Sequence, residues 1–504
     1  MAAPAFPDRI AVVVAEPTAA AFLRQAVRLS RAARLLELRL DALGSIAAVV
    51  QVLERVAQRP LRVPWIATCR PRAQGGGFEG SASAQLAVLA LAVRAGCSWV
   101  DVDGDSLERL PSKLRAALLP SVGRIVSHHD FTRTPRNLEV LFQRLARLGA
   151  DWVKIAVTAK TQADNTRLLA MTRRHRRRVI SVAMGTVGLP GRILALAAGS
   201  ALTYAAPDNG RATAPGQPTV SELRRVYRAE RLDSRTRVYG LLGNPVAHSL
   251  SPAMHNAAFA RARLDAVYLP FEAGSPGELL GFLAPLRIAG LSVTHPHKQV
   301  ILRYLDAIDP LAETIGAVNT VVVRGGGKLF GYNTDYVGVL RTLQRHVPLE
   351  GARVLLLGAG GAARACAFAL ATAGAYISVT ARRPAAARAL AHSVGGEAVL
   401  RAALRHRRFD AIINCTPVGQ APDVHTSPLR AEELNCHVVF DLVYNPIETR
   451  LLRLARRRGC RTVPGWQMPV EQGASQFEIW TGLRAPLAVM RRAVLNGLRS
   501  HARA

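Results

Sequence analysis

The chain has 504 residues, more than the roughly 250–300 that a single hydrophobic core supports, so two or three domains are expected. A hydrophobic content of 49% with 40 glycines fits a globular α/β protein and excludes a disordered or fibrous chain. No apolar run approaches the roughly 18–20 residues of a membrane span, and the six cysteines form no Cys-x-x-Cys pair. We expect a cytoplasmic protein without a signal peptide, zinc site or disulfide framework.

The formal charge of +31 raises the question of nucleic-acid binding. Basic residues are spread along the whole chain, however, and only 173–178 forms a dense run. Aromatic residues make up only 5% of the chain, which leaves little material for stacking bases. We interpret the charge as solvated faces that suit acidic small-molecule substrates. A basic nucleic-acid scaffold stays as an alternative of another class.

Lysine is scarce in this chain. Only five of the 66 basic residues are lysines, and the others are arginines. A retained lysine is therefore a candidate for chemistry that a guanidinium cannot perform, because only an amine loses its proton and forms a Schiff base. The five are Lys113, Lys154, Lys160, Lys298 and Lys328.

Eight short apolar runs alternate with helical stretches in the first half of the chain. This alternation predicts a (β/α)8 barrel over residues 1–233, with its chemistry at the C-terminal ends of the strands. Polar residues fall at those ends, with Arg192 in the loop after the seventh strand. The expected strands are 10–15, 35–40, 63–69, 99–103, 124–128, 152–157, 179–183 and 201–205.

Lys154 lies inside the apolar strand 152–157, where burial should lower its pKa and increase the neutral, nucleophilic fraction. His128 and His129 are adjacent, so on an extended strand they point to opposite faces. That geometry disfavours a metal site with two histidines. It favours one histidine acting as acid and base beside a lysine that forms a Schiff base.

Several motifs of this half resemble type I 3-dehydroquinate dehydratases. They are Glu-Leu-Arg-Leu-Asp at 37–41, Arg70 followed by Gly75-Gly76, Ser-His-His-Asp-Phe at 127–131, Lys-Ile-Ala at 154–156 and Ala-Pro-Gly-Gln at 214–217. The resemblance implies that Lys154 forms an imine with the substrate ketone and that His129, not His128, is the acid/base. No cofactor is then needed. Gln74 replaces a Glu and Thr213 a Ser of the family pattern, and an amide at 74 cannot relay a proton. The implied substrate-holding residues are Glu37, Arg39, Arg70, Arg192, Thr213 and Gln217.

The second half opens with a short strand at 238–243 and a loop containing Ser249 and Ser251 before Pro252. Hydroxyls near a helix N-terminus suit a carboxylate, although this pattern taken alone favours an ordinary serine helix cap followed by proline. Further on, Lys298 follows a strand, and with Asp335 it forms a plausible proton-transfer pair. His295 and His297 lack a third ligand at a recognisable spacing, so no metal is expected.

A nucleotide-binding module is predicted from residue 353 onward. A buried strand at 354–357 leads into Gly-Ala-Gly-Gly-Ala-Ala at 358–363, whose glycines would let backbone amides approach a pyrophosphate. The next strand ends at Ala381, Arg382 and Arg383 without an acidic residue. Because an acidic residue there would bind the ribose hydroxyl of NAD, its absence favours NADP.

The motif order of this half resembles shikimate dehydrogenase over its whole length. The resemblance implies Lys298 and Asp335 as the catalytic pair. Ser292, Tyr336 and Ala381 depart from the family pattern. The implied substrate contacts are Ser249, Ser251, Thr294, Asn319, Gln472 and Tyr444, the last on the nicotinamide side. The implied cofactor contacts are Gly358, Ala359, Gly360, Gly361, Ala362, Arg382, Arg383, Asn414, Thr416 and Gly465.

Together the two halves predict a bifunctional enzyme, a monomer or homodimer, that acts on 3-dehydroquinate and then on 3-dehydroshikimate with NADPH. It is expected to bind small molecules and neither nucleic acid nor membrane. The expected domains are 1–233, 234–345 completed by helices of 466–504, and 346–465. A dehydratase fused to an NAD-preferring quinate/shikimate dehydrogenase is the enzymatic alternative, which Ser249, Ser251 and Arg382 argue against.

Overall fold

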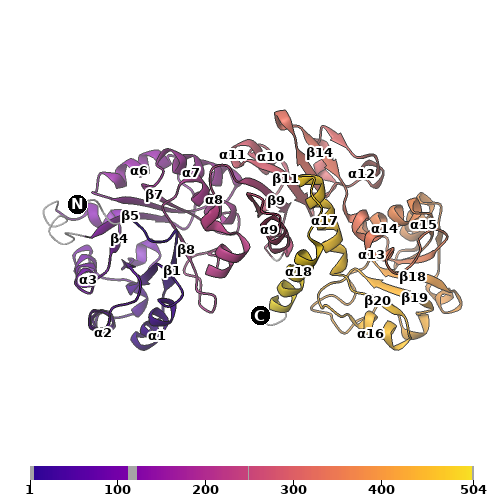
Figure 1. The fold of residues 1–504 in the computed structure, drawn as a ribbon, viewed down its shortest axis with the longest axis horizontal. Helices are drawn as coiled ribbons and strands as arrows, with labels where there is room; N and C mark the ends of the chain where they lie inside the picture. The colour runs from indigo at the N-terminus through magenta and orange to yellow at the C-terminus, as the bar shows by residue number, and fades with distance from the viewer. Residues whose placement is uncertain (1–4, 112–121, 248, 502–504) are drawn as a thin grey trace. The chain divides into compact units, whose positions relative to one another are not determined.

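The structure is a computed structural model, and it describes residues 5–111, 122–247 and 249–501 (Figure 1). Lys113 lies outside the described residues. The chain divides into two compact units, Met1–Arg237 with Leu269–Arg287 and Val238–Tyr268 with Ile288–Ala504. Throughout the described ranges, no helix is long and apolar enough to cross a bilayer.

The first unit contains an eight-stranded parallel sheet in the order β7-β6-β5-β4-β3-β2-β1-β8, which confirms the predicted barrel. The register runs without a break from β1 to β7, and β1 also pairs with β8. Between β7 and β8, Ala201 N donates to Val179 O at 2.9 Å in place of a continuous ladder. The strands are β1 (Ile10–Val14), β2 (Leu36–Arg39), β3 (Trp65–Thr68), β4 (Trp99–Asp103), β5 (Gly123–Asp130), β6 (Trp152–Thr158), β7 (Val179–Met184) and β8 (Thr203–Ala205).

Helices surround this sheet, and several begin at a side chain that accepts a hydrogen bond from the first turn (Figure 1). Thr18, Ser45 and Ser81 cap α1, α2 and α3 in this way. The apolar faces of the helices pack on the buried strands to form the core. The helices are α1 (Ala19–Leu29), α2 (Ile46–Gln58), α3 (Ala82–Arg94), α4 (Gly104–Glu108), α6 (Leu138–Ala146), α7 (Gln162–Arg174) and α8 (Leu189–Ala198), with 3₁₀ turns η1 (Leu40–Leu43) and η2 (Arg72–Gln74).

The arginine-rich segment 221–235, which follows the barrel, has a composition that predicts one helix, but the structure forms two short turns instead. A π-helical turn η3 (Glu222–Val226) is followed by a 3₁₀ turn η4 (Ala229–Arg231). Arg228 between them has a φ of 49°, which ends the first turn. Arg224 forms ion pairs with Asp8 and Glu230, so the segment is fastened to the start of the barrel.

The second unit contains a mixed sheet in the order β10-β9-β11-β13-β14-β12. β9 and β11 are parallel, whereas β13 is antiparallel to both β11 and β14. The carboxyl ends of β9, β11 and β14 and the beginning of β13 therefore meet at one edge. The strands are β9 (Arg237–Gly243), β10 (Ala266–Glu272), β11 (Ile288–Val293), β12 (Ala307–Ile308), β13 (Thr320–Val323) and β14 (Leu329–Tyr332).

A third sheet is fully parallel, in the order β17-β16-β15-β18-β19-β20. The strand order reverses beside β15, which is where open α/β sheets bind ligands. Its strands are β15 (Arg353–Leu357), β16 (Tyr376–Thr380), β17 (Glu397–Ala398), β18 (Phe409–Asn414), β19 (Cys436–Asp441) and β20 (Arg461–Val463).

The helices of the second unit cover both of its sheets. α17 crosses between them, because it packs against α9, α13 and α18. The helices are α9 (Ser251–Arg261), α12 (Pro310–Ile315), α13 (Asp335–Leu343), α14 (Gly361–Thr372), α15 (Pro384–Ser393), α16 (Arg450–Arg457), α17 (Gln467–Thr481) and α18 (Leu487–His501), with 3₁₀ turns η5 (Val300–Tyr304), η6 (Gly325–Gly327), η7 (Arg401–His406) and η8 (Ala431–Glu433). Two short helices, α10 (Gly277–Leu280) and α11 (Leu283–Leu286), belong to the segment Leu269–Arg287 that groups with the first unit.

Candidate active sites

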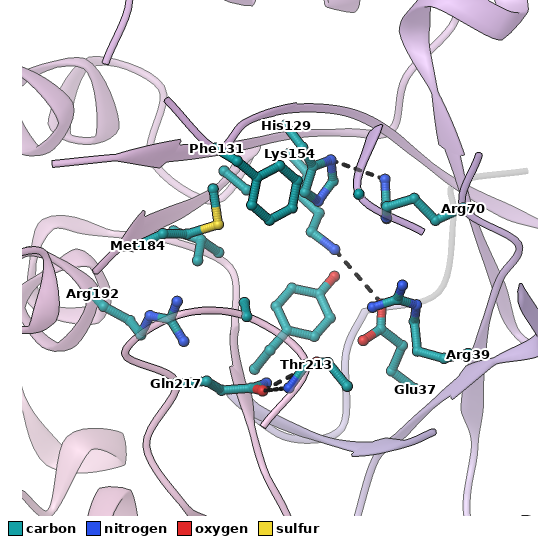
Figure 2. A pocket seen from close by; sticks show the side chains of 15 residues that line it. Glu37, Arg39, Arg70, His129, Phe131, Lys154, Met184, Arg192, Thr213 and Gln217 are labelled. Carbon is teal, nitrogen blue, oxygen red and sulfur yellow. Dashed lines mark hydrogen bonds and ion pairs between the residues drawn. The ribbon is translucent and has the colours of Figure 1, made fainter. Parts of the chain in front are cut away.

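A pocket opens at the carboxyl ends of the barrel strands (Figure 2). All eight residues predicted for the first site line it, from β2, β3, β5, β6, α8 and the loop after β8. His128, which the strand geometry turns the other way, is absent from this lining. The lining residues are Glu37, Arg39, Arg70, Gly75, His129, Phe131, Lys154, Ala156, Val182, Met184, Arg192, Tyr204, Thr213, Ala214 and Gln217.

Lys154 lies in the middle of β6 and is 5% exposed. Its Nζ donates to Asp101 Oδ2 at 2.7 Å and lies 3.6 Å from Glu37 Oε1. The pKa of Lys154 is lowered, because burial outweighs the two carboxylates that favour the ammonium. The amine is thus easier to deprotonate than an exposed lysine and remains tethered by its neighbours.

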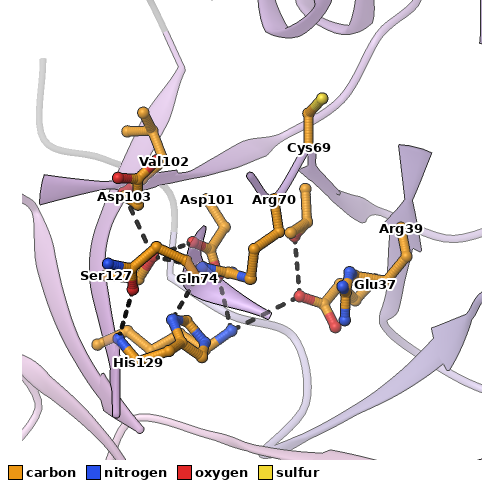
Figure 3. A network of polar contacts seen from close by, with 12 residues as sticks. Glu37, Arg39, Cys69, Arg70, Gln74, Asp101, Val102, Asp103, Ser127 and His129 are labelled. Atoms are coloured by element: carbon orange, nitrogen blue, oxygen red, sulfur yellow. Dashed lines mark hydrogen bonds and ion pairs between the residues drawn. The ribbon is translucent and has the colours of Figure 1, made fainter. Parts of the chain in front are cut away.

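Asp101, on β4, is the centre of a buried polar network (Figure 3). Besides Lys154, it accepts from Ser127 Oγ at 2.6 Å and forms an ion pair with Arg70 at 2.9 Å. Burial alone would raise the pKa of Asp101, but Arg70 and Lys154 bring it well below the ordinary range. The sequence analysis did not select Asp101 or Ser127. The sequence feature that could have identified Asp101 was the presence of two aspartates inside the apolar run 99–103.

His129 Nδ1 lies 2.9 Å from Arg70 Nη1 (Figure 2). Because a guanidinium only donates, Nδ1 accepts this bond, and the neutral imidazole carries its proton on Nε2. The pKa of His129 is lowered well below its ordinary value by burial and then by Arg70 and Lys154. His129 is therefore neutral and keeps a proton on Nε2 in this geometry.

Gln74 does not line the pocket. Its Oε1 accepts from the backbone N of His129 at 2.9 Å, and its Nε2 donates to Asp105 at 2.8 Å. The amide connects the turn after β3 to β5 and α4 and fixes the backbone on which His129 is carried. Gln74 thus supports His129 through its backbone rather than through its imidazole ring.

Two arginines hold positive charge at opposite sides of the pocket (Figure 2). Arg39 is fixed by Asp41 through two hydrogen bonds of 2.9 and 2.7 Å. Arg192, predicted to lie in a loop, belongs instead to the first turns of α8 and is 1% exposed. Among the described residues no carboxylate lies within ion-pair distance of Arg192, and burial lowers its pKa to about 10. A buried guanidinium that has no anionic partner is suited to bind the carboxylate of a ligand.

The loop after β8 covers the pocket. Pro215 O accepts from Gly185 N at 3.1 Å and from Arg192 Nη2 at 3.5 Å. Gln217 Oε1 accepts from Thr213 N and Oγ1 at 2.7 and 3.1 Å. These bonds hold the predicted pair of Thr213 and Gln217 together at the pocket wall.

The predicted pair of the second site is also in contact. Lys298, which follows β11, donates to Asp335 Oδ2 at 2.6 Å, and Asp335 is the first residue of α13. The lysine side chain is 36% exposed and the aspartate 13%. The two residues meet at the edge where β11 and β14 end.

Four of the predicted substrate residues lie at this edge or on helices that reach it. Thr294 directly follows β11, and Asn319 directly precedes β13, where its Oδ1 accepts from Thr334 N at 2.7 Å. Ser251 begins α9, and its backbone N donates to Ser249 Oγ at 3.2 Å. Asn319 Nδ2 is buried without a partner among the described residues, so it is free for a ligand.

Gln472 lies on α17 where this helix packs against α13. A side-chain carbon placed on Gly338 of α13 would lie 3.0 Å from Gln472 Cβ, so the two helices touch within one turn of Asp335. Only a glycine at 338 permits this approach. The contact places Gln472 of α17 beside the first turn of α13, which begins at Asp335.

The glycine-rich turn has the geometry of a dinucleotide site. Gly358, after β15, has a φ of 110°, and α14 begins at Gly361 with Gly360 as its N-cap. Side-chain carbons placed on Gly360 or Gly361 would meet no atom within 4 Å, so the space beside this turn is open. Arg382 and Arg383, after β16, are exposed. The residues present thus fit a dinucleotide, with arginines available for a phosphate on its ribose.

Asn414, at the end of β18, is fixed by the buried Asp441 on β19. Asn414 Nδ2 donates to Asp441 at 2.8 Å, and its Oδ1 accepts from Thr416 Oγ1 at 2.6 Å. Burial raises the pKa of Asp441 to about 6. Gly465 packs directly on the carbonyls that follow β19, whereas Tyr444 is 48% exposed and forms no hydrogen bond recorded for the described chain. Asp441 is a further residue that the sequence analysis did not select.

Family models match both halves. Type I 3-dehydroquinase matches residues 10–234, the substrate-binding domain of shikimate dehydrogenase matches residues 241–321, and the C-terminal domain of shikimate 5'-dehydrogenase matches residues 465–495. The first model covers the barrel, the second covers most of the mixed sheet with Lys298, and the third covers α17 and much of α18; Asp335 lies between the two matched ranges.

Individual proteins are similar to the chain over different spans. The chloroplastic bifunctional 3-dehydroquinate dehydratase/shikimate dehydrogenase of Arabidopsis thaliana is 36% identical over 475 residues, which are 90% of this chain and 78% of the relative. The NADP(+) shikimate dehydrogenase of Moorella thermoacetica is 47% identical over 52% of this chain and 94% of its own length. The crystal structure of Thermus thermophilus shikimate 5-dehydrogenase with NADP(H) and shikimate is 41% identical, covers 52% of this chain and 100% of that one, and has a TM-score of 0.48.

A barrel with a buried lysine beside a histidine in one pocket, joined to a dinucleotide-binding unit with a lysine–aspartate pair, defines a two-part enzyme. One part is a lyase and the other is an oxidoreductase. The chain belongs to the family of bifunctional 3-dehydroquinate dehydratase/shikimate dehydrogenases.

Proposed function

We propose that Lys154 and His129 dehydrate 3-dehydroquinate in the barrel pocket. Lys154 bonds to the substrate ketone and loses water to form an imine, which acidifies the adjacent carbon. His129 removes a proton from that carbon and returns one to the departing hydroxyl, so water leaves and 3-dehydroshikimate is released after hydrolysis of the imine. The observation that carries this proposal is the buried Lys154 with a lowered pKa, facing the same pocket as His129.

The base role of His129 requires an unprotonated Nε2, whereas the contact of Arg70 with Nδ1 places the imidazole proton on Nε2. We therefore infer that Arg70 releases Nδ1 when the substrate binds. Arg70 keeps two other partners, Asp101 at 2.9 Å and Ser127 at 3.0 Å, that hold it in place after the release.

We infer that the remaining pocket residues orient the substrate. Arg192, buried and without an anionic partner among the described residues, is the receptor for its carboxylate. Glu37, Arg39, Thr213 and Gln217 would hold its hydroxyls from the opposite wall and from the loop after β8.

Trapping the imine tests the first site. Incubation with 3-dehydroquinate and borohydride should reduce the imine to a stable amine and label Lys154, as peptide mass spectrometry would show. Lys160, which is exposed on the same half of the chain, is the matched control and should stay unlabelled. A label on another lysine, or none, would rule out the proposed dehydratase mechanism.

For the second site, we propose that Lys298 and Asp335 move the proton that accompanies reduction of 3-dehydroshikimate. NADPH, when bound, supplies the hydride. Lys298 donates a proton to the substrate oxygen as it becomes a hydroxyl, and Asp335, at 2.6 Å, orients the ammonium and accepts the proton in the reverse direction. Ser249 and Ser251 would hold the carboxylate, with Thr294, Asn319 and Gln472 on the ring hydroxyls.

We propose that the turn from Gly358 to Ala362 binds the pyrophosphate and that Arg382 and Arg383 bind the 2′-phosphate. Asn414, Thr416, Tyr444 and Gly465 are proposed for the nicotinamide side. Comparing turnover with NADP and NAD, in the wild type and in Arg382→Ala/Arg383→Ala, tests this. The double variant should lose about 10-fold or more in NADP over NAD preference. A preference for NAD in the wild type, with quinate as a substrate, would favour the alternative dehydrogenase.

We further propose domain limits of 1–233, 234–345 with 466–504, and 346–465, supported by the three separate sheets. All six cysteines are free, which is compatible with the cytoplasmic location proposed for the chain. A monomer or homodimer is the proposed assembly, which light scattering would test.

A further inference from the structure

Tyr204 lines the barrel pocket from β8 and was not selected from the sequence. It is 5% exposed, and its hydroxyl has no hydrogen-bond partner among the described residues. Its ring lies 3.9 Å from Lys154 Nζ. A buried hydroxyl without a partner is unfavourable, and such groups in native proteins usually serve a ligand. The position of Tyr204 beside the nucleophilic nitrogen indicates which ligand atoms are within its reach.

We propose that the Tyr204 hydroxyl donates a hydrogen bond to the substrate ketone oxygen while Lys154 attacks the ketone carbon. This inference rests on the proposed dehydratase function. The ketone oxygen is attached to the carbon that bonds to Nζ, so it must pass close to a phenol whose ring touches Nζ. Among the described residues that contact Nζ directly, Glu37 and Asp101 are carboxylates, which cannot donate to this oxygen when ionised, so Tyr204 carries the donor closest to the reacting nitrogen.

The hydrogen bond acts on a step with a defined proton balance. The Nζ lone pair bonds to the ketone carbon, the C=O π pair moves to the oxygen, and one proton from the nitrogen reaches that oxygen. The C–O bond then breaks as the nitrogen lone pair forms C=N, and the oxygen leaves as water. The second proton of this water molecule is the one that the Lys154 ammonium released when it became the neutral amine. Tyr204 neither gains nor loses a proton, but stabilises the negative charge that develops on the oxygen.

The surroundings of Tyr204 keep it in its donor form. Burial, and then the nearby carboxylates Glu37 and Asp101, raise the pKa of the phenol well above its ordinary value. A neutral phenol next to two carboxylates and without a bond to either is ready for an oxygen that arrives with the substrate.

Tyr204→Phe tests the proposal, because it removes the hydroxyl and keeps the ring beside Lys154. Single-turnover trapping with 3-dehydroquinate and borohydride would measure the rate at which the imine forms, alongside steady-state kcat and KM. The expected result is an imine-formation rate about 10-fold slower, with kcat/KM reduced by the same factor. Tyr227→Phe, which removes another buried phenol hydroxyl outside the pocket lining, is the matched control and should change neither quantity.

The second activity of the same chain checks folding, since reduction of 3-dehydroshikimate by Tyr204→Phe should equal that of the wild type. Far-UV circular dichroism and the urea midpoint of the variant provide a second check on the barrel itself. An unchanged imine-formation rate in the folded variant would overturn the proposal. A raised KM with an unchanged imine-formation rate would also overturn it, because the hydroxyl would then hold another substrate group. Failure of wild-type trapping on Lys154 would instead reject the dehydratase mechanism itself.

Discussion

Both candidate sites pair a lysine with an aspartate at hydrogen-bond distance, but the surroundings of the two lysines differ. Lys154 is 5% exposed and is enclosed by Asp101, Glu37 and the Tyr204 ring within one barrel. The Lys298 side chain is 36% exposed, and Asp335 is its one ion-pair partner among the described residues. The first site is a closed network, and the second is a single pair at the edge of a sheet.

The difference follows from what each lysine is proposed to do. A nucleophile must lose its proton and meet a carbon atom, so burial that lowers its pKa is useful, although the buried charges must be balanced by partners. An acid that protonates an oxygen needs its proton and a way to regain it from solvent, which an open site permits. Four experiments can test this difference between the two sites.

Exchanging each lysine for arginine should separate the two roles most strongly. Lys154→Arg keeps the charge but cannot form an imine, so dehydration should fall by at least about 10⁴-fold. Lys298→Arg keeps a cation beside Asp335 and loses mainly acidity, so reduction should fall by about 10²-fold. Steady-state assays of both reactions on both variants measure this. A Lys154→Arg variant with substantial dehydration would contradict the proposed role, and the untouched activity of each variant is the control.

Removing the aspartates should reveal the difference in burial. Asp101→Asn leaves the Lys154 and Arg70 cations without their shared partner, which should lower the free energy of unfolding by about 3–5 kcal/mol. Asp335→Asn breaks a partly exposed, solvent-screened pair, and the loss should stay within about 1 kcal/mol. Equilibrium urea unfolding measures both. Equal losses of unfolding free energy in the two variants would contradict the proposed difference in burial between the two lysine–aspartate pairs.

The pH dependence of dehydration should respond to Glu37. The neutral amine of Lys154 is lost as pH falls through its pKa, so kcat/KM should decline on the acid side. Glu37 favours the ammonium, so Glu37→Gln should lower the pKa of Lys154 further and move this acid limb to lower pH. The pH profile of kcat/KM for 3-dehydroquinate tests the shift. An acid limb that stays in place or moves to higher pH would show that Glu37 does not raise the pKa of Lys154. The pH profile of the reduction reaction is the control and should not move.

Asp441 should produce the smallest effect. Its pKa is about 6 in the folded chain, above its ordinary value of 3.8, so its stabilising contribution is complete at low pH and is lost as pH rises through about 6. Between pH 5 and pH 7.5 the loss should be about 1 kcal/mol. Asp441→Asn cannot ionise, so the stability difference between wild type and variant should change by that amount over this range. Urea unfolding at the two pH values measures it, and a constant difference would contradict the raised pKa.

Much of the barrel and its site could be predicted because parallel barrels bury both faces of short strands and place polar residues where strands end. Lys154 stood out because it interrupts an apolar strand in a chain that uses arginine almost everywhere else. Asp101 and Tyr204 could not be selected in this way. Their roles depend on which neighbouring strand they face, and register across the barrel is not written into the local pattern.

The segment between the two halves illustrates another limit. Its composition predicts one helix, but the ion pairs of Arg224 with Asp8 and Glu230 hold two short turns against the barrel. Tertiary contacts outweigh local helix propensity at this point. Gln74 was likewise noticed as a missing proton relay, whereas its role in the structure is to hold the His129 backbone.

Because the ladder between β7 and β8 is incomplete, we expect the stability of the barrel to depend on its ligand. The loop after β8 is joined to the end of β7 through Gly185 and to Arg192, which is also the proposed carboxylate receptor. A ligand bound to Arg192 adds its binding free energy to the closed form of this edge. We expect amides of Val179–Met184 and Thr203–Ala205 to exchange with deuterium fastest among the barrel strands in the free enzyme. They should gain the most protection with a non-reactive dehydroquinate analogue, so that the substrate itself completes the closure of the barrel.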